Sequence, residues 1–354
     1  MLRCGSCARV EYCGRACADA HWAAHKAACE AATVARVRSG DGDLEAADRT
    51  LRNAVKRARK ELGREHAKTL ECQNTYAKYL QNAGRFEEAA ALFRQTLELQ
   101  RRTLGDSHPD TLTSINNLAT LLHAQGKLGE AEPLAREALD GQRRTLGDSH
   151  PNTLASINNL AQLLQAQGKL GEAAPLLRDV LEWARRTLGD SHPNTLTYIN
   201  NMANLLQAQG KLDEAEPLFR EDLEEFRRTL GDSHPNTLTS ISNLAGLLLA
   251  QGKLGEAEPL YREALDGQRR TLGDSHPSTL TSINNVALLL QEQGKLGEAE
   301  PLFREALDGF RCTLGDSHSE TLSSLFNLAD LLEKRGQRAE AEDLYREQLR
   351  RAAA

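Results

Sequence analysis

No stretch of the 354-residue sequence approaches the roughly 18 consecutive apolar residues that a membrane-spanning helix needs. No apolar segment follows Arg3, so we expect no secretory signal peptide. Positive charge is neither in excess nor clustered, because the formal net charge is −6 and the basic residues are scattered. A nucleic-acid-binding surface would need such a cluster. We therefore expect a cytoplasmic protein, with the nucleus as an alternative, and neither a membrane nor a nucleic-acid partner.

Cysteine is scarce over most of the chain. Of the seven cysteines, only Cys72 and Cys312 lie outside the first 29 residues. Such crowding at one end does not resemble the disulfide framework of a secreted protein. It favours a reducing compartment and thiolate–metal bonds.

Sequence motifs of catalysis are also missing. The chain has no nucleophile elbow, no phosphate-binding loop and no nucleotide fingerprint. We therefore predict that the protein is not an enzyme and has no small-molecule substrate.

What fills the chain instead is an internal repeat. "LGDSHP" occurs at 104–109, 146–151, 188–193, 230–235 and 272–277, "LGDSHS" at 314–319 and the divergent "LGREHA" at 62–67, always 42 residues apart. In one repeat, Pro109 suits the first turn of a helix, and apolar residues then recur at helical spacing up to Gly126. A second apolar helix follows and ends at Gly147, with Pro133 near its start. Each repeat is therefore predicted to be a helix hairpin.

A single hairpin cannot bury its own apolar face, so neighbouring hairpins must stack into a solenoid. The pattern "LGDSHP…NNLA…GK..EAEPL…AL" resembles the tetratricopeptide repeat, and in particular its kinesin-light-chain-type subclass. This resemblance implies an all-α, right-handed superhelical solenoid of helix-turn-helix repeats. Residues 42–62 are in register with the second helix of a further repeat, for which 31–41 could supply a degraded first helix.

Comparison of the repeats with one another shows which positions of the first helix vary. The first variable column holds Thr120, Gln162, Asn204, Gly246, Leu288 and Asp330, and the second holds His123, Gln165, Gln207, Leu249, Gln291 and Glu333. A third column lies four residues before the first one. It holds Asn74, Asn116, Asn158, Asn200 and Asn284, and two repeats have Ser242 and Phe326 at this position instead. These positions are spaced i, i+4, i+7 and share one helix face, away from the apolar one.

The resemblance implies that the first helices line a concave surface, into which this face would point. An asparagine side chain both donates and accepts hydrogen bonds, so it can pair with the backbone of an extended peptide of any sequence. We therefore predict a peptide-binding site at Asn74, Asn116, Asn158, Asn200 and Asn284, with selection of side chains by Thr120, Gln162, Asn204, His123, Gln165 and Gln207. The alternative is that these positions are merely exposed and that the asparagines descend from one ancestral copy. A second asparagine column, from Asn117 to Asn327, could hold helix ends or inter-repeat geometry as readily as a ligand.

Histidine recurs before each expected first helix. His108, His150, His192, His234, His276 and His318 stand 42 residues apart. A catalytic histidine is normally single and has unique partners. We interpret these histidines as structural.

The opening "MLRCGSCARVEYCGRACADAHWAAHKAAC" contains closely spaced soft ligands of the kind that Zn²⁺ prefers. From Cys17 onward, Cys17, His21, His25 and Cys29 are four residues apart, as on one helix stripe. His25 and Cys29 could complete a tetrahedron with Cys4 and Cys7. By count alone, Cys4, Cys7, Cys13 and Cys17 could also share one ion.

The string "YCGRACADAHWAAHKAAC" resembles the MYND zinc finger, a family in which eight ligands hold two interleaved zinc ions. The resemblance assigns Cys4, Cys7, His25 and Cys29 to one full site, and Cys13 and Cys17 to half of a second site. Two further cysteines expected upstream are absent, so either the chain starts too late or the finger holds one firm zinc ion.

These features predict residues 1–30 as the finger, 31–61 as a linker and degenerate helix pair, and 62–354 as seven repeats. MYND fingers of the kind that this string resembles are protein-interaction modules. We therefore expect a non-enzymatic scaffold or adaptor whose partners are proteins or extended peptides. The alternatives are a cargo adaptor like the kinesin light chain, although no heptad segment is present, and the regulatory part of a larger enzyme whose N-terminal portion is missing.

Overall fold

A computed structural model describes residues 2–3, 11–12 and 44–352 of the chain. The chain divides into two compact units, Met1–Lys169 (unit 1) and Leu170–Ala354 (unit 2). Apart from one pair of two-residue strands, all regular structure in the described residues is helical. Each unit is described below by itself.

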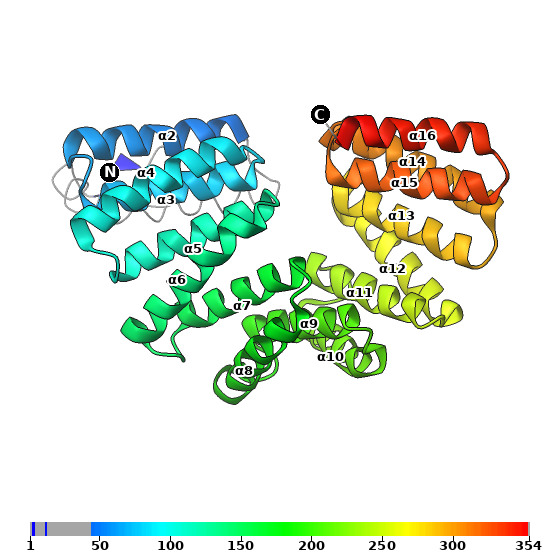
Figure 1. The fold of residues 1–354 in the computed structure, drawn as a ribbon, viewed down its shortest axis with the longest axis horizontal. Coiled ribbons are helices and arrows are strands. Elements are labelled where there is room, and N and C mark those ends of the chain that lie inside the picture. Colours follow the sequence, from blue (N-terminus) through cyan, green and yellow to red (C-terminus); the bar gives the residue numbers. More distant parts are fainter. Residues whose placement is uncertain (1, 4–10, 13–43, 353–354) are drawn as a thin grey trace. The chain divides into compact units, whose positions relative to one another are not determined.

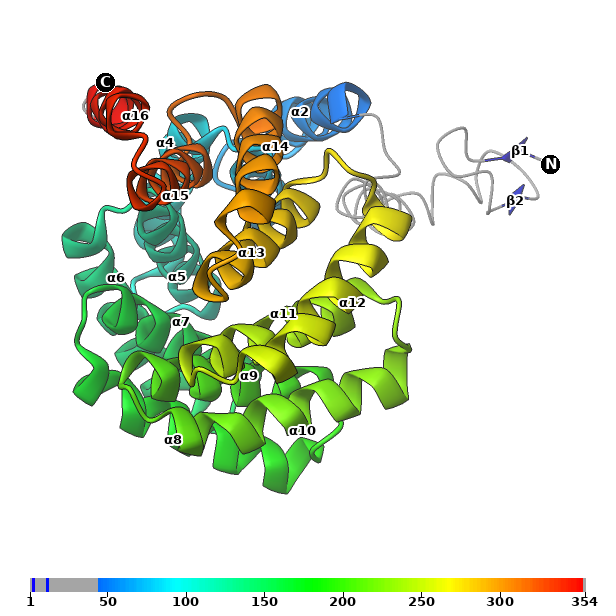
Figure 2. The same cartoon turned by 90° about the vertical axis from the view of Figure 1, so that its right-hand side faces the viewer.

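Unit 1 contains six described helices, labelled in Figure 1, and the strand pair, labelled in Figure 2. Strand β1 (Leu2–Arg3) is antiparallel to β2 (Glu11–Tyr12), with Leu2 opposite Tyr12. The helices are α2 (Leu44–Glu61), α3 (Ala67–Asn82), α4 (Phe86–Leu104), α5 (Pro109–Ala124), α6 (Leu128–Leu146) and α7 (Pro151–Ala166). Each helix packs against the next one along the chain, so the hairpins stack in sequence order.

Unit 2 repeats this arrangement with nine described helices (Figure 1). They are α8 (Leu170–Leu188), α9 (Pro193–Ala208), α10 (Leu212–Leu230), α11 (Pro235–Ala250), α12 (Leu254–Leu272), α13 (Pro277–Glu292), α14 (Leu296–Leu314), α15 (Ser319–Lys334) and α16 (Arg338–Ala352). Successive helices again pack pairwise, and the first helix α13 also touches the first helices α11 and α15 on either side of it. The predicted all-α solenoid of helix hairpins is confirmed.

The ends of each helix follow from the repeated residues around it. The Nδ1 atom of His108 accepts a hydrogen bond from the backbone N–H of Asp110 at 3.2 Å, which satisfies one of the otherwise unpaired donors of the helix start. Gly126 ends the first helix with φ +73° and Gly147 the second with φ +84°, a backbone region that glycine enters without steric cost. The other capping histidines are His66, His150, His192, His234, His276 and His318. Their structural interpretation is confirmed.

The apolar positions that recur at helical spacing form the core between the helices of each hairpin. Leu112, Ile115 and Leu118 of α5 are buried. Ala119 and Ala131 are buried as well, and these small side chains let the two helices approach closely.

Pro133 lies near the start of α6, as expected, but beyond its first turn. This residue is the sixth of α6 and lies inside the helix, so it is not in the first turn. A proline there removes the N–H that would bond to the carbonyl of Gly129, at a cost that a first-turn proline avoids.

A ladder of ion pairs joins the second helices of neighbouring hairpins. In unit 1, Arg101 Nη2 lies 2.6 Å from Glu137 Oε1, and in unit 2, Arg227 Nη2 lies 2.6 Å from Glu263 Oε1. Further rungs join Arg185 to Glu221, Arg269 to Glu305 and Arg311 to Glu347. The partners are always 36 residues apart. All are partly exposed to solvent, so each rung contributes little to stability.

One buried carboxyl group interrupts the regular core. Asp222 on α10 is 1% exposed, and its Oδ2 atom accepts a hydrogen bond from Ser240 Oγ at 2.7 Å. Its Oδ1 atom has no hydrogen-bond partner in the described part of the chain. Burial raises the pKa of Asp222 to about 6. The same repeat position holds Thr96 and Ala138 in unit 1 and Val180, Ala264 and Ala306 in unit 2, none of which carries a charge.

Candidate peptide-binding site

The predicted peptide-binding residues all lie on first helices. In unit 1 they are Asn74 on α3, Asn116, Thr120 and His123 on α5, and Asn158, Gln162 and Gln165 on α7; in unit 2 they are Asn200, Asn204 and Gln207 on α9, and Asn284 on α13. All are half-buried except Asn158, which is buried. The face is thus partly covered by neighbouring repeats, which an isolated helix pattern does not reveal.

The two asparagine columns bond to each other from one hairpin to the next. Asn243 Nδ2 donates to Asn200 Oδ1 at 2.9 Å, and Asn327 Nδ2 donates to Asn284 Oδ1 at 3.2 Å. In unit 1, Asn159 Nδ2 lies 3.4 Å from Asn116 Oδ1 and 3.3 Å from Thr120 Oγ1. We call each pair, 43 residues apart, an amide rung. These bonds give the second column an inter-repeat role.

The first rung of unit 1 is open. By the same spacing, Asn117 should donate to Asn74. Asn74 Nδ2 instead donates to Ser114 Oγ at 2.7 Å. Asn74 Oδ1 and Asn117 Nδ2 are therefore left without hydrogen-bond partners in the described residues. An unpaired acceptor and an unpaired donor thus remain where the three rungs described above are closed.

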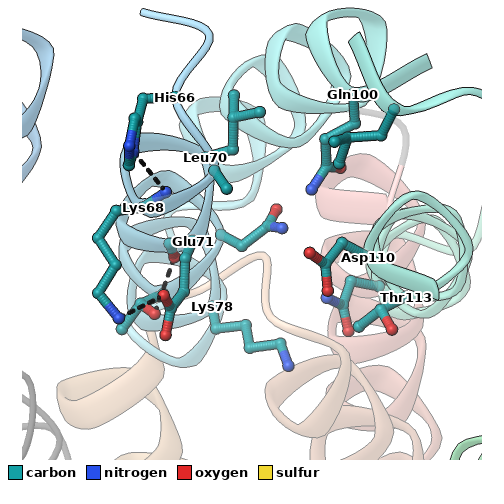
Figure 3. Close-up of a pocket in the computed structure, with 13 residues that line it drawn as sticks. His66, Lys68, Leu70, Glu71, Lys78, Gln100, Asp110 and Thr113 are labelled. Atoms are coloured by element: carbon teal, nitrogen blue, oxygen red, sulfur yellow. Dashed lines mark hydrogen bonds and ion pairs between the residues drawn. The ribbon is translucent and has the colours of Figure 1, made fainter. Parts of the chain in front are cut away.

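Both members of the open rung line a cavity of about 450 Å³, which we call the α3–α5 cavity. This volume lies within the range of about 300–1,000 Å³ that is usual for ligand pockets. Its lining is His66, Ala67, Lys68, Leu70, Glu71, Asn74, Thr75, Lys78, Gln100, Leu104, Asp110, Thr113 and Asn117. Figure 3 shows Lys68 and Glu71 on one side of it and Gln100, Asp110 and Thr113 on the other.

The charges around the α3–α5 cavity balance, since two lysines face two acidic residues. Lys68 Nζ lies 2.9 Å from Glu71 Oε2. Gln100 is 2% exposed, and its Oε1 atom has no hydrogen-bond partner among the described residues. The cavity therefore adjoins buried, unpaired amide atoms of three of its lining residues and has no excess charge.

Three predicted residues meet at a second, much smaller pocket. Thr120, His123 and Gln162 line a space of about 10 Å³ between α5 and α7. Such a space is about the size that one water molecule occupies. Burial lowers the pKa of His123, which favours its uncharged form. These residues are thus close enough to act together on a side chain that passes over them.

Of the residues that line the α3–α5 cavity, only Asn74 was among the predicted binding residues. Lys78 occupies the repeat position of Thr120 one period earlier, so extending that column by 42 residues would have found it. Gln100 belongs to a second helix, and Gln142 and Gln268 share its repeat position, so nothing in the sequence distinguishes it.

The predicted zinc ligands Cys4, Cys7, Cys13, Cys17, His25 and Cys29 lie outside the described residues. Within the described ranges, no group of three or more histidine, cysteine or acidic side chains could hold a metal ion. No helix among those ranges is long and apolar enough to cross a membrane.

Comparison with known proteins identifies the class. Seven overlapping segments match the tetratricopeptide repeat model, at 27–101, 73–144, 115–182, 153–224, 197–270, 240–311 and 278–354. The chain therefore belongs to the tetratricopeptide repeat family, whose members are in general non-enzymatic protein-interaction scaffolds. Residues 1–29 match the MYND finger, a module that in general binds zinc. No curated protein matches the chain.

Solved structures agree with this assignment. One similar structure is a single-residue variant of nearly identical TPR-like repeats from a Podosopora anserina protein assigned as a kinesin light chain. It is 32% identical to this chain, with a TM-score of 0.51. The match covers 58% of this chain and 98% of that one. The apo form of the quorum sensor NprR from B. thuringiensis is 15% identical over 87% of this chain and 82% of that one, with a TM-score of 0.64. Apo RapI is 13% identical over 80% and 97%, with a TM-score of 0.60. The last two share the fold alone.

Proposed function

We propose that the protein is a non-enzymatic scaffold that binds an extended peptide along the first helices of unit 1, beginning at its open rung. The observation that carries this proposal is the pair of unpaired amide atoms, Asn74 Oδ1 and Asn117 Nδ2, beside the α3–α5 cavity. A buried polar group without a partner destabilises a protein by about 1–3 kcal/mol. A ligand that satisfies both atoms would recover this free energy on binding.

A peptide group has the complementary chemistry. The N–H of one extended residue can donate to Asn74 Oδ1 and the carbonyl of the same residue can accept from Asn117 Nδ2, because both groups point to the same side of an extended chain, so one residue would close the rung. Gln100 offers a further amide at the buried side of the cavity. Because backbone groups are the same in every residue, this contact would fix the peptide's position without reading its sequence. The variable columns, including Lys78 and Thr120, would then select among side chains.

This proposal can be tested with a displayed library of short unstructured peptides selected on the full chain. A selected peptide is then titrated by fluorescence anisotropy against the double variant Asn74→Ala/Asn117→Ala. We expect the affinity to fall about tenfold, since two hydrogen bonds contribute about 0.5–1.5 kcal/mol each and 1.4 kcal/mol is tenfold.

The matched control is Asn243→Ala in unit 2, which removes the donor of a closed rung. Peptide affinity should be unchanged there, with both variants shown to be folded by circular dichroism. Equal affinity of the double variant and the unsubstituted chain would show that the open rung is the wrong site.

The MYND finger would hold a second partner, so that the chain brings two proteins together. Cys4, Cys7, His25 and Cys29 would hold one zinc ion, which would stabilise a segment too short to form a large core. Cys13 and Cys17 would supply half of a second site. We expect a zinc content near one ion per chain by elemental analysis of the purified protein, and a value near two would contradict this one-site assignment.

A second candidate function is a cargo adaptor similar to a kinesin light chain. It is favoured by the 32% identity with the Podosopora anserina repeats. Binding of the full chain to a purified kinesin heavy-chain coiled coil would support it. Absence of binding at micromolar concentrations would leave the scaffold as the better proposal.

A further inference from the structure

The last hairpin carries a different stripe from all the others. Phe326, Asp330 and Glu333 on α15 occupy the three positions that hold Asn284, Leu288 and Gln291 one repeat earlier. We call Phe326, Asp330 and Glu333 the C-terminal stripe. Phe326 is 49% exposed, although large apolar side chains are usually buried. In the six earlier repeats this position holds asparagine or serine.

The exposed ring belongs to a small aromatic cluster that includes a carboxylate. The ring of Phe326 lies 5.7 Å from the ring of Tyr345 on α16, at an angle of 55°. The hydroxyl of Tyr345 donates to Glu333 Oε2 at 3.4 Å. Figure 2 shows α15 and α16 side by side at the C-terminal end of the described chain. One carboxylate and two aromatic rings therefore form a single surface.

The two acidic residues of the stripe differ in their partners. Asp330 is satisfied by Lys334 Nζ at 2.8 Å and by Gln291 Nε2 at 2.9 Å. Glu333 is exposed and makes no ion pair among the described residues; its hydrogen bond comes from the hydroxyl of Tyr345. The pKa of Tyr345 is raised, mainly by partial burial and to a smaller extent by the negative charges of Glu333 and Asp330. The surface thus has one carboxylate, that of Glu333, which makes no ion pair among the described residues.

We propose that the C-terminal stripe binds an arginine or lysine side chain of an extended partner segment. The cation would lie over the face of Phe326, where the ring quadrupole attracts positive charge, and its N–H groups would donate to Glu333. An aliphatic side chain would leave Glu333 without a partner, and an acidic one would be repelled. The proposal extends the scaffold function, because the partner is again an extended segment, but it uses none of the residues of the open rung.

The test uses the full chain and three fluorine-labelled glycine–serine peptides that differ at one residue, which is arginine, norleucine or glutamate. Binding is followed by fluorine NMR, which detects weak complexes. We expect the arginine peptide to bind at least threefold more tightly than the norleucine peptide, and the glutamate peptide to bind least. Phe326→Asn, which restores the residue of the earlier repeats, should weaken the arginine peptide about two- to fivefold, the range for an exposed cation–π contact. Glu333→Gln should have an effect of about the same size.

Two controls separate this site from others. Glu263→Gln on α12 removes a carboxylate that is paired with Arg227 elsewhere in unit 2, and it should leave the arginine peptide unaffected. Asn74→Ala/Asn117→Ala should also leave it unaffected, so failure of the open rung and failure of the C-terminal stripe can be told apart.

Three outcomes would overturn the proposal. The first is equal binding of the arginine and norleucine peptides. The second is a loss for Glu263→Gln as large as for Glu333→Gln, which would indicate non-specific attraction to an acidic protein. The third is self-association of the chain that disappears in Phe326→Asn, which would assign the surface to a second copy.

Discussion

Units 1 and 2 are built from the same hairpin but bury different polar groups. In unit 1, unpaired amide atoms of Asn74 and Asn117 adjoin a cavity of about 450 Å³. In unit 2, the carboxyl group of Asp222 lies in the packed core, where unit 1 has the fully buried Ala138. Under the proposed function a ligand would satisfy the first group, whereas the second has only Ser240 and must be tolerated by the fold. The same physical cost would then support binding in one unit, and it lowers stability in the other.

Transplanting the buried carboxyl should have the largest effect. Ala138→Asp places a carboxyl group at a position that is 0% exposed, near the buried Ser156, the counterpart of Ser240. Overpacking and desolvation together should lower the free energy of unfolding of unit 1 by about 4 kcal/mol at pH 7. Hydrogen exchange of α6 and α7 by mass spectrometry measures this. Unchanged protection of both helices would contradict the account.

The reverse change in unit 2 should be stabilising. The pKa of Asp222 is raised to about 6 from 3.8, so its charged form is disfavoured in the folded state. This penalty is absent below the unfolded pKa, grows as the pH rises and is complete above the folded pKa. Asp222→Ala should therefore stabilise unit 2 by about 3 kcal/mol at pH 7, at 1.36 kcal/mol per unit of pKa. The gain should shrink towards zero at pH 4. Urea unfolding at both pH values tests it, and a gain independent of pH would exclude ionisation as its cause.

Closed amide rungs should contribute less, and unequally in the two units. Asn243→Ala removes a 2.9 Å hydrogen bond in unit 2, and Asn159→Ala removes longer contacts of 3.3 and 3.4 Å in unit 1. We expect a loss of about 1 kcal/mol for the first and about half of that for the second. Urea midpoints of the two variants provide the comparison, and a larger loss for Asn159→Ala would reverse it.

The ion-pair ladder should have the smallest effect and should not distinguish the units. Arg101→Gln and Arg227→Gln each break a pair whose partners are about 40% exposed. Each should lower stability by less than about 1 kcal/mol. The loss should fall further in 1 M salt, where the screening length is about 3 Å. Thermal melts at low and high salt would show this, and a loss that persists in high salt would point to packing by the arginine side chains.

The hairpins, their caps and their cores could be predicted because they depend on residues close together in the sequence. Pro109, Gly126 and Gly147 mark helix ends by local backbone chemistry, and the apolar spacing identifies the buried face. The predicted peptide-binding columns lie on one face for the same reason. Whether they bind a peptide remains a proposal, and the zinc ligands lie outside the described residues.

The amide rungs could not be predicted in the same way. They join residues 43 apart, one more than the repeat length, and this offset depends on how successive hairpins stack. The open rung depends on a side-chain choice, the bond from Asn74 to Ser114, which the repeat pattern does not specify. Asp222 can be read from the sequence, but its burial can be inferred only from the repeat position that it shares with Ala138, which is fully buried.

The constant offsets also determine how such a chain can change its length. Rungs 43 residues apart and ion pairs 36 residues apart connect only neighbouring hairpins. Removing residues 235–276, one full period, would place Asn285 opposite Asn200 and Glu305 opposite Arg227, the same residue types as before. A chain of this kind can therefore lose or gain 42 residues within this region and still form matched contacts at the new junction.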